Sequence, residues 1–132
     1  MGSVSDLLLD THALLWWLLD DAQLSAPARA AIAEPGNRIW VSAASGWEVA
    51  TKHRIGKLPE AAEIAERFSY YLRRARFIEL PISIEHSLKA GALPGPHRDP
   101  FDRMLIAQHF VTRYPVVTRD AVFRDYGVAI VW

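Results

Sequence analysis

The sequence has no cysteine, no long apolar run and no excess of charge of either sign. Without cysteine, the chain forms no disulfide and has no thiolate nucleophile. No apolar stretch approaches the roughly 18 residues that span a bilayer, and the first residues lack the basic, apolar and small-residue order of a secretory signal. We therefore expect a cytoplasmic protein that is not attached to a membrane.

The charged residues balance, with 15 Lys and Arg against 15 Asp and Glu. A net charge of zero offers no broad attraction to a polyanion, so any binding of nucleic acid must use local patches. Basic side chains gather at residues 52–57 and 73–76. Because solvated helix faces are the ordinary use of such groups, we favour that interpretation for either group taken alone.

What the sequence does contain is a regular alternation of short apolar runs and longer amphipathic ones. This pattern is typical of an α/β protein with a central, mostly parallel sheet, and 132 residues suit one domain with one core. We predict strands at residues 7–9, 39–41, 77–80, 116–118 and 129–132. We predict helices at 11–19, after Ser25, after the second strand to about Gly56, from Pro59 to about Arg74, after Ser83, and from Asp102 to about Val111.

Four acidic residues stand beside predicted strand ends or helix starts. Asp10 ends the first strand, Asp120 follows the strand at 116–118, and Asp102 and Glu48 lie near helix starts. Right-handed crossovers bring such positions to one edge of a parallel sheet. Two like charges about 4 Å apart repel by roughly 4 kcal/mol at an effective dielectric of 20, so the cluster must take up protons or bind a cation. Oxygen ligands alone favour Mg²⁺ or Mn²⁺ over zinc.

Each of these acids also has a purely structural interpretation. Residues 45–48 match a capping box, in which the glutamate bonds the backbone at the helix start. Asp99 followed by Pro100 is an ordinary helix cap, and Asp10 and Asp120 fit the roles of a cap and a turn residue. For a single acid the two interpretations are about equal, and the joint pattern favours a shared site.

Four segments, in order, resemble the PIN-domain family: 8–12, 42–50, 99–107 and 117–120. More narrowly, they are similar to its VapC branch, the ribonuclease toxins of bacterial and archaeal toxin–antitoxin pairs. A leading Leu-Leu-Asp-Thr is a weak signal alone, whereas four segments with acids in register are a specific one. The resemblance covers nearly the whole chain and implies a three-layer α/β/α fold in a single domain over residues 1–132.

The resemblance implies an endoribonuclease that depends on Mg²⁺, for which Mn²⁺ substitutes, and that cleaves RNA such as tRNA or ribosomal RNA. Asp10 and Asp102 would be the principal metal ligands, and Glu48 and Asp120 would complete the catalytic site directly or through water. A second register makes Asp99 the ligand, and we prefer Asp102 because it aligns the following helix without a gap. Water activated by the metal would leave a 5′-phosphate and a 3′-hydroxyl.

Other residues are expected to support this site. Thr11 and Thr118 would support the acids by hydrogen bonds, and we interpret His12 as structural. Basic residues near this edge are candidates for RNA contacts, namely Lys52, Arg54, His97 and Arg98.

The resemblance also implies two protein partners. The first is a VapB-like antitoxin whose segment wraps an apolar surface and places an arginine among the acids, and the second is another copy of the chain in a homodimer. Adjacent helix residues diverge by about 100°, so Trp16 and Trp17 do not both point into one core, and one of them is a candidate to face a partner.

Two other classes of protein are alternatives. A catalytically inactive PIN-fold module that binds RNA or protein would keep the fold without the reaction. A phosphoacceptor receiver domain needs an acidic pair at the first strand and a lysine near the last one. Here the first strand ends in one acid, and no lysine follows Lys89, so we rank the receiver domain last.

Overall fold

The computed structural model describes residues 4–132, which form a five-stranded sheet whose pairings are all parallel. The strand order is β3–β2–β1–β4–β5. The strands are β1 (Asp6–Leu9), β2 (Arg38–Ser42), β3 (Ile78–Leu80), β4 (Val116–Val117) and β5 (Ile130–Val131). This sheet confirms the α/β class predicted from the sequence.

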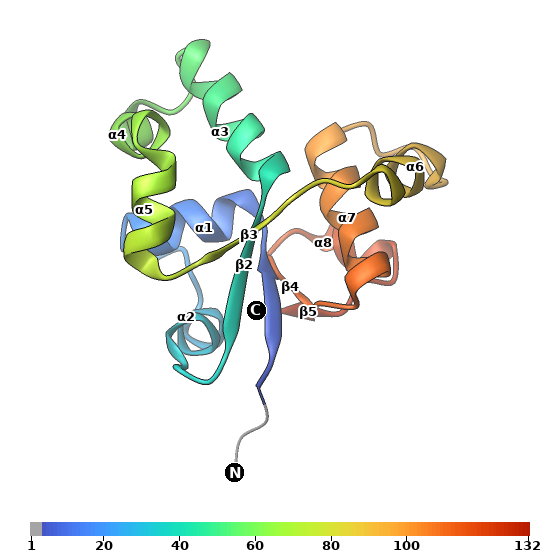
Figure 1. Ribbon diagram of the computed structural model, residues 1–132, viewed down its shortest axis with the longest axis horizontal. Helices are drawn as coiled ribbons and strands as arrows, with labels where there is room; N and C mark the ends of the chain where they lie inside the picture. The colour runs from blue at the N-terminus through green and yellow to red at the C-terminus, as the bar shows by residue number, and fades with distance from the viewer. Residues whose placement is uncertain (1–3) are drawn as a thin grey trace.

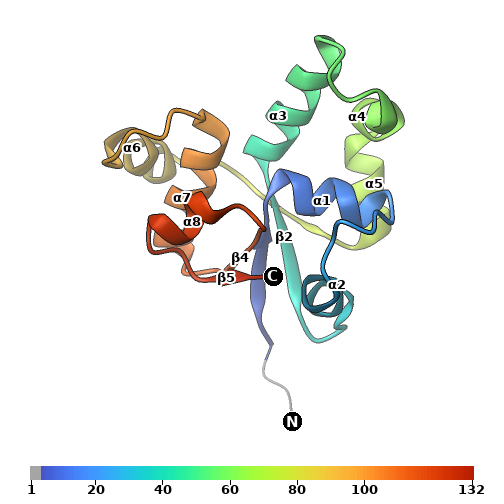
Figure 2. The same ribbon diagram turned by 180° about the vertical axis from the view of Figure 1, so that it is seen from behind.

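Helices cover both faces of the sheet (Figure 1), and the view from behind shows the same division (Figure 2). One side carries α1 (Thr11–Leu18), α2 (Ala26–Ala33), α4 (Ala62–Glu66) and α5 (Phe68–Ala75), with the short 3-10 helix η1 (Pro59–Ala61) before α4. The other side carries α6 (Ile84–Ala92), α7 (Pro100–Thr112) and α8 (Ala121–Asp125). The helix α3 (Ala43–Arg54) extends beyond the end of β2 and contacts both α4 and α7. The predicted three-layer arrangement is confirmed.

The first strand explains why two helical layers are needed. Leu7 and Leu9 pack into the core cluster beneath α1 and α2, whereas Leu8 packs into the cluster beneath α7 and α8. Successive side chains of a strand point to opposite faces, so a continuous apolar run requires cover on both. Each fully buried leucine contributes roughly 2 kcal/mol from the removal of its surface from water. Among the helices of residues 4–132, none combines the length and apolar character needed to traverse a bilayer.

The long helix predicted from Pro59 to about Arg74 is wrong. Arg67 has φ −129° and ψ 39°, outside the helical region, and it separates α4 from α5. The two helices bury different surfaces, because Ile64 of α4 packs with α3 and α1 whereas Leu72 of α5 packs against the sheet. The break at Arg67 thus separates two short helices that belong to different core clusters.

The segment after β4 also differs from the sequence prediction. The helix α8 was not predicted, and Asp120 is its N-cap and accepts a hydrogen bond from the Val122 N–H. A helix of five residues is too short to show a helical period in the sequence. Phe123 anchors α8 because its side chain is fully buried in the second core cluster. The last strand is also shorter than the predicted 129–132.

Candidate active site

The topological switch point of the sheet lies between β1 and β4. From β1, the sheet continues through β2 and β3 on one side and through β4 and β5 on the other. The helices that follow β1 and β4, α1 and α8, therefore leave toward opposite faces (Figure 1). Ligand sites of open parallel sheets form in the crevice outside the strand ends at such a point. Asp10 directly follows β1 at this position, and Thr118 directly follows β4.

Asp10 is held rigidly at this edge and is only 5% exposed. One carboxylate oxygen, Oδ1, accepts a hydrogen bond from the Ala13 N–H at 2.7 Å and caps α1. The other oxygen, Oδ2, accepts from the Thr118 hydroxyl at 2.5 Å, and the same hydroxyl accepts from the Asp120 N–H at 3.0 Å. Burial raises the pKa of Asp10, although the bonds from Thr118 and Ala13 oppose that rise. The carboxylate is thus a desolvated charge with a fixed orientation.

Glu48 lies on α3 and is also 5% exposed. The predicted capping box is wrong, since the N-cap of α3 is Ser42, whose hydroxyl accepts from the Ala44 N–H at 3.0 Å. Ser45 is inside the helix and accepts a hydrogen bond from the Thr11 hydroxyl at 2.9 Å. Thr11 therefore joins α1 to α3. Its hydroxyl bonds Ser45 and none of the four acids, so the predicted support of the acids by Thr11 is wrong. Glu48 therefore takes no part in capping α3.

Two of the predicted RNA-contact residues pair with these acids. The Lys52 Nζ lies 2.6 Å from the Glu48 Oε2, one helical turn along α3. The His97 Nε2 lies 3.0 Å from the Asp102 Oδ2. The other two candidates, Arg54 and Arg98, have exposed side chains. In this structure, Lys52 forms an ion pair with Glu48, and His97 lies at hydrogen-bond distance from Asp102.

Asp99 and Asp102 occupy different positions at the start of α7. Asp99 is the N-cap, and its Oδ1 accepts hydrogen bonds from the Phe101 and Asp102 N–H groups at 2.9 and 3.2 Å. The side chain of Asp102 points to His97 and the other acids, and burial is the main cause that raises its pKa to about 6. The hydrogen bond from His97 opposes this rise, whereas the neighbouring charges of Asp99, Asp120 and Glu48 add to it.

Electrostatic effects on pKa link the four acids, which are called the acidic cluster below. The charges of Asp120 and Glu48 act on Asp102, and the charge of Asp120 also raises the pKa of Asp10. Within residues 4–132, no three acidic, histidine or cysteine side chains are arranged to hold a metal ion together. The donor set is nonetheless made of carboxylate oxygens, which suit Mg²⁺ or Mn²⁺. A divalent ion would relieve the buried like charges, once the side chains of Glu48 and Asp102 turned from their present partners.

A small cavity of about 220 Å³ opens directly on this cluster. It is lined by Asp10, His12, Trp16, Arg119 and Asp120. Neither Trp16 nor Arg119 was predicted to belong to the site. Arg119 had one local signal, since it stands directly between Thr118, at a strand end, and Asp120.

The fold and the site can now be compared with known proteins. A family model described as PIN domain matches residues 7–129. No curated protein sequence matches the chain. A structure of VapBC2 from Rickettsia felis, bound to a DNA fragment from their promoter, is similar with a TM-score of 0.70 and 14% identity, covering 95% of this chain and 96% of that chain.

Two further structures share the fold. A toxin–antitoxin complex from Klebsiella pneumoniae has a TM-score of 0.53 and 16% identity, covering 86% of each chain. FitAcB from Neisseria gonorrhoeae has a TM-score of 0.56 and 18% identity, covering 94% of this chain and 95% of that chain. At these identities the structures support the fold alone, whereas the family model spans nearly the whole sequence. The chain therefore belongs to the PIN-domain family, as the order of its acidic segments predicted.

Proposed function

We propose that the chain is a metal-dependent endoribonuclease toxin of the VapC branch, acting in the cytoplasm. The observation that carries the proposal is the cluster of Asp10, Glu48, Asp102 and Asp120 at the switch point of the sheet. Two of these carboxylates are 5% exposed, and burial and like charges raise the pKa of a third, Asp102, to about 6. Helix capping explains Asp10 and Asp120 one at a time but does not explain why the charges of Asp120 and Glu48 also act on Asp102, and PIN domains are generally nucleases.

Each residue has a specific task in the proposed reaction. Bound Mg²⁺ or Mn²⁺ would supply a water of lowered pKa and offset the charge that develops on the phosphoryl oxygens. Asp10 and Asp102 would hold the ion, and Glu48 and Asp120 would hold its water shell. The Thr118 hydroxyl and the Ala13 N–H keep the Asp10 carboxylate in one orientation. We prefer Asp102 to Asp99 as the ligand because the charges of Glu48 and Asp120 act on the Asp102 carboxyl group.

The proposal is tested by adding the purified chain to total RNA in Mg²⁺, Mn²⁺ or EDTA and sequencing the new ends. We expect cleavage with either ion, no cleavage in EDTA, and products with a 5′-phosphate and a 3′-hydroxyl, because water attacks phosphorus directly. A substrate without the 2′-hydroxyl at the scissile nucleotide should still be cleaved. Cleavage in EDTA, or products with a 2′,3′-cyclic phosphate, would contradict the metal–water mechanism.

A catalytically inactive PIN-fold binding module is the second candidate, and one observation favours it. Lys52 already pairs with Glu48 at 2.6 Å and His97 bonds Asp102 at 3.0 Å, so two of the four acids have side-chain partners without an ion. This module would bind RNA or protein but leave RNA intact in both Mg²⁺ and Mn²⁺. The cleavage assay described above therefore separates the two candidates.

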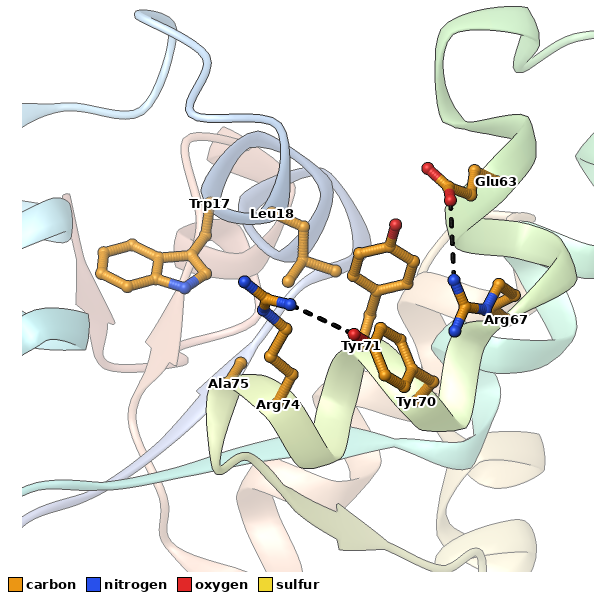
Figure 3. Close-up of a pocket in the computed structure, with 8 residues that line it drawn as sticks. All are labelled: Trp17, Leu18, Glu63, Arg67, Tyr70, Tyr71, Arg74 and Ala75. Atoms are coloured by element: carbon orange, nitrogen blue, oxygen red, sulfur yellow. Dashed lines mark hydrogen bonds and ion pairs between the residues drawn. The ribbon is translucent and has the colours of Figure 1, made fainter.

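We propose that an antitoxin of VapB type binds in a second cavity, which lies between α1 and α5 (Figure 3). This cavity has a volume of about 610 Å³ and is lined by Trp17, Leu18, Glu63, Arg67, Tyr70, Tyr71, Arg74 and Ala75. The Arg67 guanidinium stands 4.1 Å from the centre of the Tyr70 ring, and Arg74 donates to the Tyr70 hydroxyl at 3.1 Å. Aromatic rings beside two arginines suit a segment that carries both apolar and acidic side chains.

Charge reversal in this cavity provides the test. Arg74→Glu should weaken binding of the protein encoded by a neighbouring short reading frame at least 10-fold by calorimetry, because a glutamate there repels the acidic side chains of the bound segment. A 10-fold loss corresponds to about 1.4 kcal/mol. Arg113→Glu, at the far end of α7, is the matched control and should have no effect. Equal affinity of both variants would contradict this location.

The homodimer that we also propose should appear by light scattering of the free chain at micromolar concentration.

A further inference from the structure

Arg119 differs from Lys52 and His97, two other basic residues beside the acidic cluster, because it has no carboxylate partner among residues 4–132. Lys52 and His97 each lie within 3.0 Å of a carboxylate of the cluster. Arg119 has an exposed side chain and forms no ion pair within residues 4–132. It immediately follows Thr118, which bonds Asp10, and immediately precedes Asp120. A full positive charge therefore stands at the rim of the acidic crevice without a carboxylate partner.

Trp16 fixes the position of this charge. The Arg119 guanidinium lies 4.6 Å from the centre of a Trp16 ring. Trp16 in turn is stacked on His12, with ring centres 5.4 Å apart at an interplanar angle of 20°, and packs beside Trp132 at 5.9 Å. A guanidinium resting on an aromatic ring keeps its N–H groups free for other acceptors. The long side chain is thus oriented before a ligand arrives.

The size and lining of the cavity indicate the kind of ligand. Arg119, Trp16 and His12 enclose about 220 Å³ together with Asp10 and Asp120. Sites that enclose a drug-sized molecule have about 300–1,000 Å³, so this cavity suits a single small charged group. Arginine binds phosphate through two parallel hydrogen bonds, which a fixed planar guanidinium favours. An RNA strand that reaches the acidic cluster must also bring its phosphates past four carboxylates, and a cation at the rim offsets that repulsion.

We propose that Arg119, held on Trp16, is a binding site for the RNA phosphate next to the scissile one. The inference rests on the proposed function for the identity of the polyanion. Because the contact is to the backbone, Arg119 contributes equally to RNAs of different sequence. Trp16 is a positioning residue that acts through Arg119.

Binding of fluorescein-labelled single-stranded RNAs of three different sequences tests this site. Anisotropy titrations over a range of KCl concentrations use proteins that all carry Asp10→Asn, so that the RNA stays intact. We expect Arg119→Gln to weaken binding roughly 10-fold at low salt for all three RNAs and to reduce the slope of log K against log[salt] by about 0.7, the value for one phosphate contact on a single strand. The control, Arg113→Gln, removes the same charge at the far end of α7 and should change neither quantity.

Two further variants separate charge from position. Arg119→Lys should keep the slope of the parent but lose part of the affinity, because lysine lacks the planar fork. Trp16→Phe should behave likewise, since the charge remains while its platform is smaller. Thermal unfolding in EDTA checks that each variant is folded.

The outcomes are distinguishable from those of the proposed function. If the parent chain cleaves RNA but Arg119→Gln leaves the salt slope unchanged, the phosphate site is wrong and the nuclease proposal stands. If Arg119→Gln discriminates among the three RNAs, Arg119 contacts bases, and the backbone assignment is overturned. If the parent binds and cleaves no RNA, both proposals are wrong.

Discussion

Asp10→Asn is expected to reduce RNA cleavage in Mg²⁺ by at least about 100-fold in kcat/KM, because it would remove the charge of a proposed metal ligand. Asparagine has nearly the same shape, and its oxygen can still accept the hydrogen bond from the Ala13 N–H that caps α1. The Thr118 hydroxyl can still bond the side-chain amide. The loss therefore reports the charge of Asp10. Initial cleavage rates of one labelled RNA at several concentrations provide the measurement.

Asp21→Asn is the matched control for this prediction. Asp21 lies after the far end of α1, where its Oδ1 accepts from the Gln23 N–H at 2.9 Å, a bond that asparagine retains. Activity of this variant should equal that of the parent. Thermal unfolding in EDTA adds a second readout, since burial raises the pKa of Asp10 and its charge opposes folding. Asp10→Asn should therefore unfold at the same temperature as the parent or above it. Retention of activity by Asp10→Asn would remove Asp10 from the catalytic site.

Local signals in the sequence were sufficient to predict most of the framework. The run Leu7-Leu8-Leu9 suits a strand buried on both faces, and the structure places it in one. Ser25 and Ser83 cap α2 and α6 as predicted, because each precedes a helix whose first turn supplies the N–H that the hydroxyl accepts. These features depend on neighbours within four residues and were therefore visible without coordinates.

Features that depend on distant contacts were not visible. Ser42 and Ser45 both stand at the start of a helix, and only the bond from Thr11, 34 residues away, shows that Ser45 belongs inside it. The break at Arg67 likewise depends on where α4 and α5 find their buried surfaces. No local pattern contains this information, because it is a property of packing.

The same division applies to the site. The ion pair of Glu48 and Lys52 has the (i, i+4) spacing of helical pairs, so it could have been predicted from the sequence. The bond from Thr118 to Asp10 joins residues 108 positions apart, and the contact of Arg119 with Trp16 spans the chain in the same way. The parallel order of strands brings these positions together, and side-chain packing then decides which of them touch.

The raised pKa of Asp102 makes the stability of the metal-free protein depend on pH. Its folded value of about 6 exceeds the ordinary 3.8, so between about pH 4 and pH 6 the folded chain binds more protons than the unfolded chain. The free energy of unfolding in EDTA should therefore fall as pH rises through this window, and then level off. Because Asp102 is only partly buried, we expect a change of about 1 kcal/mol.

Magnesium should reverse this dependence. Above pH 6 the Asp102 carboxylate is mostly ionised and available to the ion, and Mg²⁺ at 100 times its dissociation constant would stabilise the fold by about 2.7 kcal/mol. For a chain of this length that corresponds to a rise of roughly 8–10 °C in Tm. At pH 5 a proton on Asp102 competes with the ion, so the rise should be less than half as large. Circular dichroism melts with Mg²⁺ or EDTA at pH 5 and pH 7.5 measure both effects.

Asp102→Asn connects the two effects to one side chain. This variant cannot take up the proton at residue 102, so its stability in EDTA should fall less between pH 4 and pH 6 than that of the parent, and the remaining fall belongs to Asp10, whose pKa is also raised. It also lacks the ligand charge, so Mg²⁺ should leave its Tm nearly unchanged at pH 7.5. Equal Mg²⁺ shifts for the parent at both pH values would mean that the ion binds elsewhere. An absence of any shift at pH 7.5 would mean that Lys52 and His97 already satisfy the acids, as the inactive binding module requires.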